Sequence, residues 1–290
     1  MTHLFCFGLG YSAGILARRL SERGWAVSGT STTQAGAARI SSHGFRGLVF
    51  DGKSKLAEVT AELQSATHVL LSIPPGPSGD PALAVFGEDI AASKSISWIG
   101  YFSTVGVYGD AAGGWVNEDT DPRPASKRGQ RRLTAENAWR DLGQRCGKAV
   151  MIFRLPGIYG PGRSAIEDLR AGRARRIVKP GQIFNRIHVE DIASAVEASI
   201  KSPRAGRVYN VTDDEPAPPQ DVVSFAAGLL GRLNPPVLDF ATAELSPMAR
   251  SFYSESKRVS NARMKAELGV TLAYPSYREG LRQIAGLNES

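Results

Sequence analysis

Short apolar runs alternate with helix-spaced segments through the first part of the chain. The runs predict five strands, at residues 4–7, 25–29, 47–50, 68–73 and 96–102. Between the strands lie segments with the spacing of one helix face, such as 55–63 and the stretch from Ala13 to the terminating Gly24. Strands that alternate with helices predict an α/β fold with a parallel sheet.

The later part of the chain has a less regular pattern, in which short helices are separated by proline-rich joints. These segments run from about residue 164 to 181 and from residue 216 onward. Apolar spacing predicts helices at 191–200, 220–230 and 256–268, the last ending at Gly269. We therefore expect this part to consist of several short elements.

The turn between the first strand and the first helix reads Gly8-x-Gly10-x-x-Ala13. This is the dinucleotide fingerprint with alanine in third place: Gly8 allows the tight turn, Gly10 admits a pyrophosphate, and Ala13 keeps helix and strand close. The helix N-terminus adds free N–H groups and a positive dipole end. Glycines also serve as plain turns, but strand, turn and helix occur here in the required order. We therefore assign nucleotide binding to Gly8, Leu9, Gly10, Tyr11, Ser12 and Ala13.

The end of the second strand indicates which nicotinamide cofactor is bound. An enzyme that prefers NAD usually places Asp or Glu there to hold the ribose 2′-hydroxyl, but no carboxylate occurs from Trp25 to Gly44. Hydroxyls and a cation stand there instead, and they suit a 2′-phosphate. We therefore favour NADP over NAD and assign it to Thr30, Ser31, Thr32 and Arg39, although Arg39 also fits a solvated helix face.

Two further strand ends carry candidate cofactor contacts, because ligands of parallel sheets bind at the carboxyl ends of strands. Asp51 follows the third strand and can accept from the adenine amino group or act as a helix N-cap. Ser72, Ile73 and Pro74 end the fourth strand, and their backbone can lie along the cofactor.

Composition narrows the class of protein. The 290 residues are 42% hydrophobic, enough for a full core. No apolar run reaches the about 18 residues of a membrane span, and the first strand begins too early for a signal peptide. We therefore expect a cytoplasmic protein. Cys6 and Cys146 lack metal-ligand or redox spacing, so we assign them no chemistry and predict no metal site.

The net charge of +7 raises nucleic acid as a partner. The densest basic clusters lie at residues 127–132, opening a predicted helix, and at 170–179, in a loop-rich region. Neither cluster is interleaved with aromatic residues that stack on bases. A solvated face or an anion-binding lining therefore accounts for them better than nucleic acid does.

Five segments after the glycine turn carry motifs in a fixed order: 103–109 (STVGVYG), 154–163 (RLPGIYGPGR), 186–193 (RIHVEDIA), 208–211 (VYNV) and 256–259 (SKRV). With the glycine turn they resemble the extended short-chain dehydrogenase/reductases, the family of nucleotide-sugar epimerases and dehydratases. The resemblance spans nearly the whole chain.

The resemblance implies a Rossmann-type doubly wound parallel sheet that carries NAD(P), with a small C-terminal α+β domain that closes over the substrate. We accordingly place the NAD(P)-binding domain at 1–163, with a return of the chain around 184–212, and the substrate domain mainly at 164–290. In this family a Ser or Thr after the fifth strand holds the substrate carbonyl or hydroxyl, and Thr104 matches it. Pro156, in the second motif, is assigned to the cofactor.

The family also has a Tyr that moves the proton and, four residues on, a Lys that lowers the Tyr pKa and holds the ribose. Anchored on the Ala-Glu dipeptide at 135–136, this chain has Arg128 at the tyrosine position and Arg132 at the lysine position. Shifting the register so that Lys127 matches puts Arg123 at the tyrosine. In this respect the chain resembles an atypical branch of the family.

A guanidinium, with a pKa above about 12, can bind, orient or polarise but cannot act as a base. Arg132 can hold the ribose or a phosphate. Arg128 either grips an anionic substrate or points into solvent. Position in the motifs makes other residues candidates for proton transfer, namely Tyr108, Glu118, Asp119, Tyr159 and His188, although a histidine in such a strand is more often a packed residue.

The sequence thus predicts an NADP-binding oxidoreductase or epimerase that acts on a polar small molecule; whether the molecule is anionic is left open, and a nucleotide sugar is one candidate. The alternative is a non-catalytic NADP-binding sensor or scaffold, with the missing Tyr-Lys pair as its signature. A homodimer is left open. By family position, the pocket-lining candidates are Phe252, Tyr253, Lys257 and Arg258.

Overall fold

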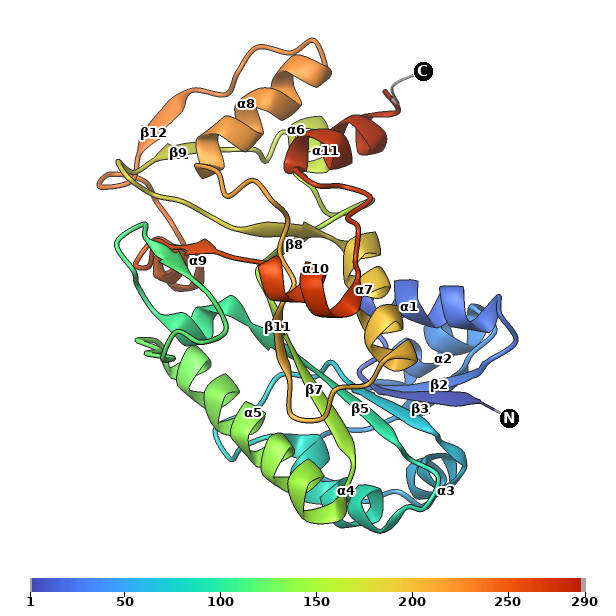
Figure 1. Ribbon diagram of the computed structural model, residues 1–290. Helices are drawn as coiled ribbons and strands as arrows, with labels where there is room; N and C mark the ends of the chain where they lie inside the picture. Colours follow the sequence, from blue (N-terminus) through green and yellow to red (C-terminus); the bar gives the residue numbers. More distant parts are fainter. Residues whose placement is uncertain (1, 288–290) are drawn as a thin grey trace. The chain divides into compact units, whose positions relative to one another are not determined.

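The computed structural model describes residues 2–287 and forms two compact units (Figure 1). The first unit contains residues 1–104, 130–154 and 193–209, and the second contains 105–129, 155–192 and 210–290. Each unit is therefore assembled from three separate segments of the chain. The domain boundaries expected from the sequence stay predictions.

A seven-stranded sheet forms the first unit, in the order β11-β7-β5-β4-β1-β2-β3. The strands are β1 His3–Phe7, β2 Ala26–Ser31, β3 Arg46–Val49, β4 His68–Leu71, β5 Trp98–Thr104, β7 Ala149–Leu155 and β11 Val208–Asn210. β1 pairs in parallel with both β2 and β4, so the strand order reverses beside it. This doubly wound parallel sheet confirms the predicted Rossmann-type fold.

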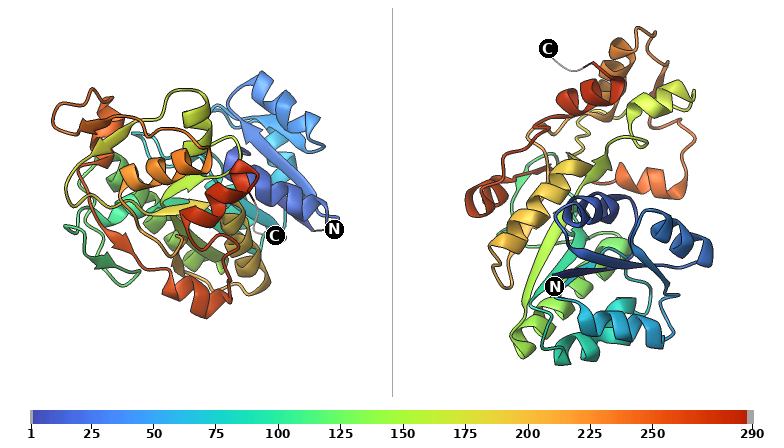
Figure 2. Two further views of the ribbon diagram at one scale, coloured as in Figure 1. Left: turned by 90° about the horizontal axis from the view of Figure 1, so that it is seen from above. Right: turned by 90° about the vertical axis from the view of Figure 1, so that its right-hand side faces the viewer.

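Helices cover both faces of this sheet. They are α1 Tyr11–Ser21, α2 Gln34–Ser42, α3 Ala57–Ser65, α4 Pro81–Ala92, α5 Lys127–Cys146 and α7 Val189–Lys201. In the right-hand view of Figure 2, α1 and α7 lie on the opposite side of the sheet from α3 and α4. Local sequence sets where they begin: Thr33 caps α2, and Asp80 caps α4 ahead of Pro81.

The core of the first unit follows from the alternation of side chains along the strands. Phe5, Phe7 and other residues of the central strands pack with α3, α4 and α5 in one cluster that includes Phe86 and Trp139. The opposite face is covered by the buried side of α1, namely Ser12, Ala13, Leu16, Ala17 and Leu20. This packing fixes the position of the turn that leads into α1.

The second unit is built from short elements. Its helices are α6 Ala165–Arg170, α8 Pro219–Leu229, α9 Pro247–Phe252, α10 Ala262–Leu268 and α11 Tyr277–Ala285, with a 3-10 turn at Val105–Tyr108. Its strands form three parallel pairs, and the members are β6 Trp115–Val116 with β13 Arg258–Val259, β8 Gly157–Tyr159 with β10 Arg186–His188, and β9 Arg176–Val178 with β12 Val237–Asp239.

One predicted helix is shorter than expected. The apolar spacing of residues 256–268 predicts a single helix, but Arg258–Val259 forms strand β13 and helix α10 begins only at Ala262. The amide of Asn185 determines the difference, because its Oδ1 accepts from the Val259 N–H at 2.8 Å while its Nδ2 donates to the Lys257 carbonyl at 3.0 Å. Side-chain bonds to the backbone here hold the extended conformation.

Candidate functional site

Gly8 shapes the glycine turn. It has φ +84°, and a Cβ on it would lie 2.6 Å from Cγ2 of Ile73. Its N–H donates to Oγ1 of Thr30 at 2.9 Å, and the Leu9 N–H donates to the Thr30 carbonyl at 3.0 Å. The turn is therefore held between the ends of β2 and β4, as the predicted topology requires.

At Gly10, unlike Gly8, neither the backbone conformation nor the packing requires glycine. It is the exposed N-cap of α1 with φ −99°, a conformation open to any residue, and a Cβ added there would meet nothing within 4 Å. No side chain caps α1, and its first turn contains no acidic residue. A helix N-terminus without a capping side chain or an acidic residue attracts an anion.

The four residues expected to hold the NADP 2′-phosphate fall into two groups. Thr30 is buried at 2% exposure and supports the glycine turn, and Ser31 packs against Gly36 at the start of α2. Thr32 and Arg39 are exposed. The Arg39 guanidinium makes no hydrogen bond or ion pair within residues 2–287. Thr32 and Arg39 therefore present side-chain donors to solvent, while Ser31 is half-buried.

Asp51 holds a local turn. Its Oδ1 accepts from the N–H groups of Lys53 and Ser54, each at 2.8 Å, and these bonds hold its pKa below the usual range. The alternative interpretation of Asp51 as a helix N-cap is wrong, because α3 begins at Ala57 with Leu56 at the N-cap. The adenine contact stays a prediction.

The end of β4 runs beside the glycine turn. The Ser72 N–H donates to the Phe7 carbonyl at 2.9 Å, and Ile73 contacts Gly8 as described above. Pro74 follows and is exposed. The topology thus brings Ser72 and Ile73 next to the fingerprint, as predicted from the strand order.

Thr104 is the half-buried last residue of β5. The preceding residue, Ser103, belongs to a buried hydrogen-bond network, in which its Oγ donates to the carboxylate of Glu136 on α5. Arg154 of β7 donates to the same carboxylate from Nη2 at 2.7 Å and from Nε at 3.2 Å. This network joins β5, α5 and β7 and so positions Thr104. Pro156 is half-buried just after β7.

Arg132 points into the first unit and is 8% exposed. Its Nη1 donates to the Phe102 carbonyl of β5 and lies 3.4 Å from the Tyr101 hydroxyl, and the guanidinium stacks over the Tyr101 ring. Burial raises the pKa of Tyr101 and of Asp80, and the nearby Arg132 charge opposes both shifts. Arg132 is thus a fixed cation at the end of β5.

Arg128 belongs to the second unit, where its guanidinium lies 5.8 Å from the ring centre of Phe252. Both side chains are exposed, which is the geometry of a surface cation–π contact. Thr104 and Arg132 belong to the first unit. The three residues predicted for catalysis are therefore divided between the two units.

The other candidates for proton transfer make bonds within the second unit. The Tyr108 hydroxyl donates to Asn210 Oδ1 at 2.8 Å, and the Tyr159 hydroxyl donates to the Ser276 carbonyl at 3.1 Å. Glu118 accepts a hydrogen bond from the Asn210 N–H, and Asp119 forms an ion pair with Arg263. His188 is buried, and its Nδ1 accepts a hydrogen bond from the Glu190 N–H. These contacts stabilise the loops of that unit.

Three of the residues that were expected to line the pocket make contacts within the second unit. Lys257 is buried and pairs with Glu255 at 2.7 Å, and Arg258 Nη1 donates to the Gly113 carbonyl. Tyr253 is buried beside Phe240, with ring centres 5.0 Å apart. Their contacts hold β13 and its neighbours in place.

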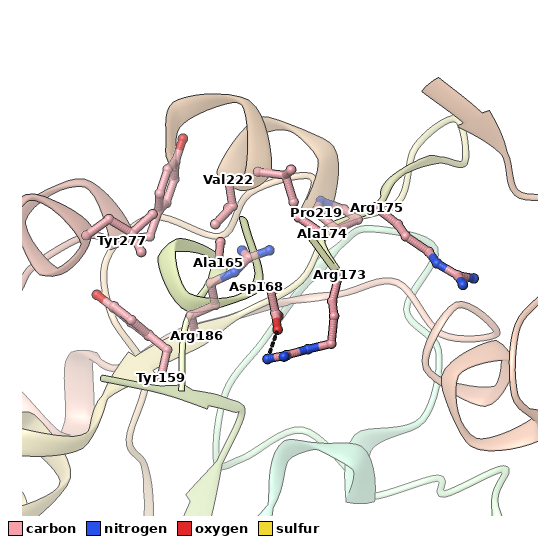
Figure 3. Close-up of a pocket in the computed structure, with 12 residues that line it drawn as sticks. Tyr159, Ala165, Asp168, Arg173, Ala174, Arg175, Arg186, Pro219, Val222 and Tyr277 are labelled. Carbon is pink, nitrogen blue, oxygen red and sulfur yellow. Dashed lines mark hydrogen bonds and ion pairs between the residues drawn. The ribbon is translucent and has the colours of Figure 1, made fainter. Parts of the chain in front are cut away.

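A cavity of about 250 Å³ lies wholly within the second unit (Figure 3). We call it the Arg186 cavity, and it is lined by Tyr159, Ala165, Asp168, Arg173, Ala174, Arg175, Arg186, Pro219, Val222, Val223, Tyr277 and Leu281. Arg173 and Arg175 come from the basic cluster at 170–179, for which an anion-binding lining was one interpretation. Arg186 of β10 and Tyr277 of α11 were not predicted as site residues from the sequence. Arg186 does lie in the family motif at 186–193, which could have pointed to it.

A family model described as the NAD dependent epimerase/dehydratase family matches residues 89–212. Protein YeeZ of Escherichia coli (strain K12) is 31% identical over 278 residues, covering 92% of this chain and 94% of that protein. The chain belongs to this family. The resemblance to epimerases and dehydratases of the extended type, stated on the motifs, is thereby confirmed.

Two further comparisons add detail. A solved structure of a functionally unknown conserved protein from Silicibacter pomeroyi DSS is 46% identical, covers 99% of both chains and has a TM-score of 0.89. A 3-diazoavenalumate denitrifying reductase from Streptomyces sp is 29% identical over 146 residues, which is 46% of each chain. Within residues 2–287, no helix combines the length and apolar character needed to span a bilayer.

Proposed function

We propose that this chain is an NADP-dependent oxidoreductase that reduces a small, polar, anionic molecule without the Tyr-Lys pair of its family. The observation that carries the proposal is the open N-terminus of α1 at Gly10. Neither backbone conformation nor packing requires glycine there, since a Cβ would point into empty space. A pyrophosphate that needs this space explains the glycine, and the N–H groups of Tyr11, Ser12 and Ala13 would hold it.

The preference for NADP over NAD rests on the end of β2. Thr32 and Arg39 are exposed there, and the carboxylate-free stretch offers nothing that would repel a 2′-phosphate. In this proposal Arg39 and Thr32 bind the 2′-phosphate, while Thr30 acts indirectly by holding the glycine turn.

The chemistry that the cofactor supplies when bound is a hydride. Thr104, fixed at the end of β5, would donate a hydrogen bond to the substrate oxygen, and Arg132 would add a positive charge at the same strand end. Epimerisation and dehydration need a side chain that takes up a proton and returns it, which a guanidinium cannot do. Reduction of an electron-poor carbonyl places the hydride on carbon and leaves an oxyanion that would take its proton from water, so no side-chain base is required. A relative named as a reductase supports this choice.

Cofactor titration tests the first part of the proposal. We expect NADPH to bind at least about tenfold more tightly than NADH, a difference of about 1.4 kcal/mol, by the change in cofactor fluorescence. Arg39→Ala should remove this preference without weakening NADH binding. Arg18→Ala, at an exposed arginine of α1, is the matched control and should leave both affinities unchanged. Tighter binding of NADH would contradict the assignment of the 2′-phosphate site.

Turnover tests the second part. Reactive carbonyl compounds that carry a carboxylate should consume NADPH, and Thr104→Ala should abolish this consumption, whereas UDP-glucose should not be epimerised. NADPH binding with no turnover of any acceptor would favour the sensor alternative. Rapid turnover of UDP-glucose that is lost in Thr104→Ala would show that a side chain other than Arg128 moves the proton.

A further inference from the structure

Arg186 is held rigidly at the edge of the Arg186 cavity. Its Nη1 donates to the carbonyl oxygens of Phe184 at 3.0 Å and of Ala217 at 3.2 Å, and its guanidinium lies 5.9 Å from the ring centre of Tyr277. The side chain therefore cannot swing away from the cavity without losing these contacts. A fixed guanidinium binds an anion with little further loss of side-chain entropy.

The remaining donors of Arg186 are unused. Within residues 2–287, neither its Nε–H nor its Nη2–H groups donate to any acceptor. Nε–H and one Nη2–H lie on one edge of the planar guanidinium and point the same way, so together they form the fork that fits the two oxygens of a carboxylate. Because Arg186 lines the cavity, this pair of donors could receive a monoanion bound there.

Charge around the cavity also favours an anion. Its lining contains Arg173, Arg175 and Arg186 but a single acid, Asp168. Figure 3 shows Arg173 directed toward Asp168, and their 3.1 Å ion pair is more than half exposed at both ends. Such an exposed pair contributes little and can open to a ligand. The lining therefore has a positive charge in excess.

The rest of the lining is apolar or aromatic. Ala165, Val222 and Leu281 contribute apolar side chains to the lining, and the buried Tyr277 ring, which also contacts Arg278, lies beside Arg186. The volume of about 250 Å³ is below the about 300–1,000 Å³ of pockets for drug-sized ligands, so a compact molecule fits better than a nucleotide.

We propose that the Arg186 cavity binds a small aromatic monocarboxylate, with the carboxylate on the Arg186 fork and the ring against Val222, Leu281 and Tyr277. The site lies entirely in the second unit, so the proposal does not depend on cofactor binding in the first. It assigns a ligand class to a cavity that the proposed reduction does not use.

Calorimetric titration of the full chain without cofactor tests this assignment. The probes are benzoate, phenylacetate and cinnamate, with cinnamamide as the neutral analogue and inorganic phosphate as the competing anion. We expect at least one of the carboxylates to bind, and cinnamamide and phosphate to bind at least about tenfold more weakly than it does. Absence of binding by all three carboxylates, or phosphate binding as tight as theirs, would overturn the proposal.

Two variants locate the site. Arg186→Lys keeps the charge but removes the fork, and Val222→Phe fills the cavity while leaving Arg186 in place; each should weaken carboxylate binding at least about tenfold. The matched control is Arg232→Lys, at an arginine of the same unit that also donates to a backbone carbonyl but lies outside the cavity lining. Carboxylate binding that survives both cavity variants in folded protein would overturn the proposal. Retained binding in Gly10→Val would show that it is independent of the cofactor site.

Discussion

Two buried carboxyl groups, one in each unit, are held in different ways. In the first unit, Glu136 accepts hydrogen bonds from Ser103 and from two nitrogens of Arg154. In the second unit, burial raises the pKa of Asp213, which is 2% exposed, to about 8, although the nearby Arg186 charge opposes this shift. A buried charge that is hydrogen-bonded to its partner fixes local structure, whereas a buried polar group without a hydrogen bond lowers the stability of the fold. Glu136 therefore holds β5, α5 and β7 together, whereas the protonated Asp213 leaves donors of Arg186 available to a ligand.

Removing the bonded carboxylate should have the largest effect. Glu136→Ala is expected to lower the free energy of unfolding by about 3–5 kcal/mol, because Arg154 stays buried without its carboxylate. Urea denaturation measures this loss. Glu88→Ala, at an exposed glutamate of α4 in the same unit, is the control and should change stability by no more than about 0.5 kcal/mol. A loss below about 1 kcal/mol in Glu136→Ala would mean that the pair does not hold the sheet.

Bulk at the glycine turn should remove cofactor binding without affecting the fold. In Gly10→Val the side chain would occupy the space that a pyrophosphate needs, so NADPH affinity should fall by more than about a hundredfold, or about 2.7 kcal/mol. Circular dichroism and thermal unfolding should match the wild type, since an added Cβ meets no atom within 4 Å.

The matched control for this change is Gly228→Val, at another glycine with open space around its Cβ but in the second unit. It should bind NADPH like the wild type. Unchanged NADPH binding in folded Gly10→Val would remove the glycine turn from the argument for a cofactor.

The smallest effect is expected at Asp213 and depends on pH. Burial raises its pKa from 3.8 to about 8, so the folded protein keeps a proton on this carboxyl that the unfolded chain releases near pH 4. Between these values the unfolded state binds fewer protons, and stability contributed by this group falls as pH rises. Asp213→Asn lacks this titration. Its stability relative to the wild type should therefore increase by about 1–3 kcal/mol between pH 5 and pH 7 in urea denaturation. A constant difference over this range would contradict the raised pKa.

The sheet of the first unit could be predicted because its signals are local. Alternating apolar runs and helix faces predicted the fold class and five of the seven strands, β1 to β5, but not β7 or β11, and the fingerprint placed Gly8 at a positive-φ turn. The sequence could not separate Thr30 from Thr32, since both are hydroxyl residues at a strand end. Only pairing within the sheet decides that Thr30 is buried under the turn while Thr32 is exposed.

The second unit was harder to predict because its contacts are distant in sequence. The helix expected at 256–268 is interrupted by a strand whose partner β6 lies far away in the chain and whose backbone is held by Asn185. The Arg186 cavity draws its lining from several separate segments, and the two carbonyls that orient Arg186 belong to Phe184 and Ala217. No spacing rule joins such residues before the chain has folded.

The interleaving of the two units has a consequence for synthesis of the chain. β11, at one end of the seven-stranded sheet, comes from residues 208–210, so β7 has an unpaired edge until that segment has left the ribosome. An open edge of this kind is a site of wrong pairing with other chains. The first unit also depends on contacts between segments far apart in sequence, which slows folding. Fragments that stop before residue 208 should therefore aggregate.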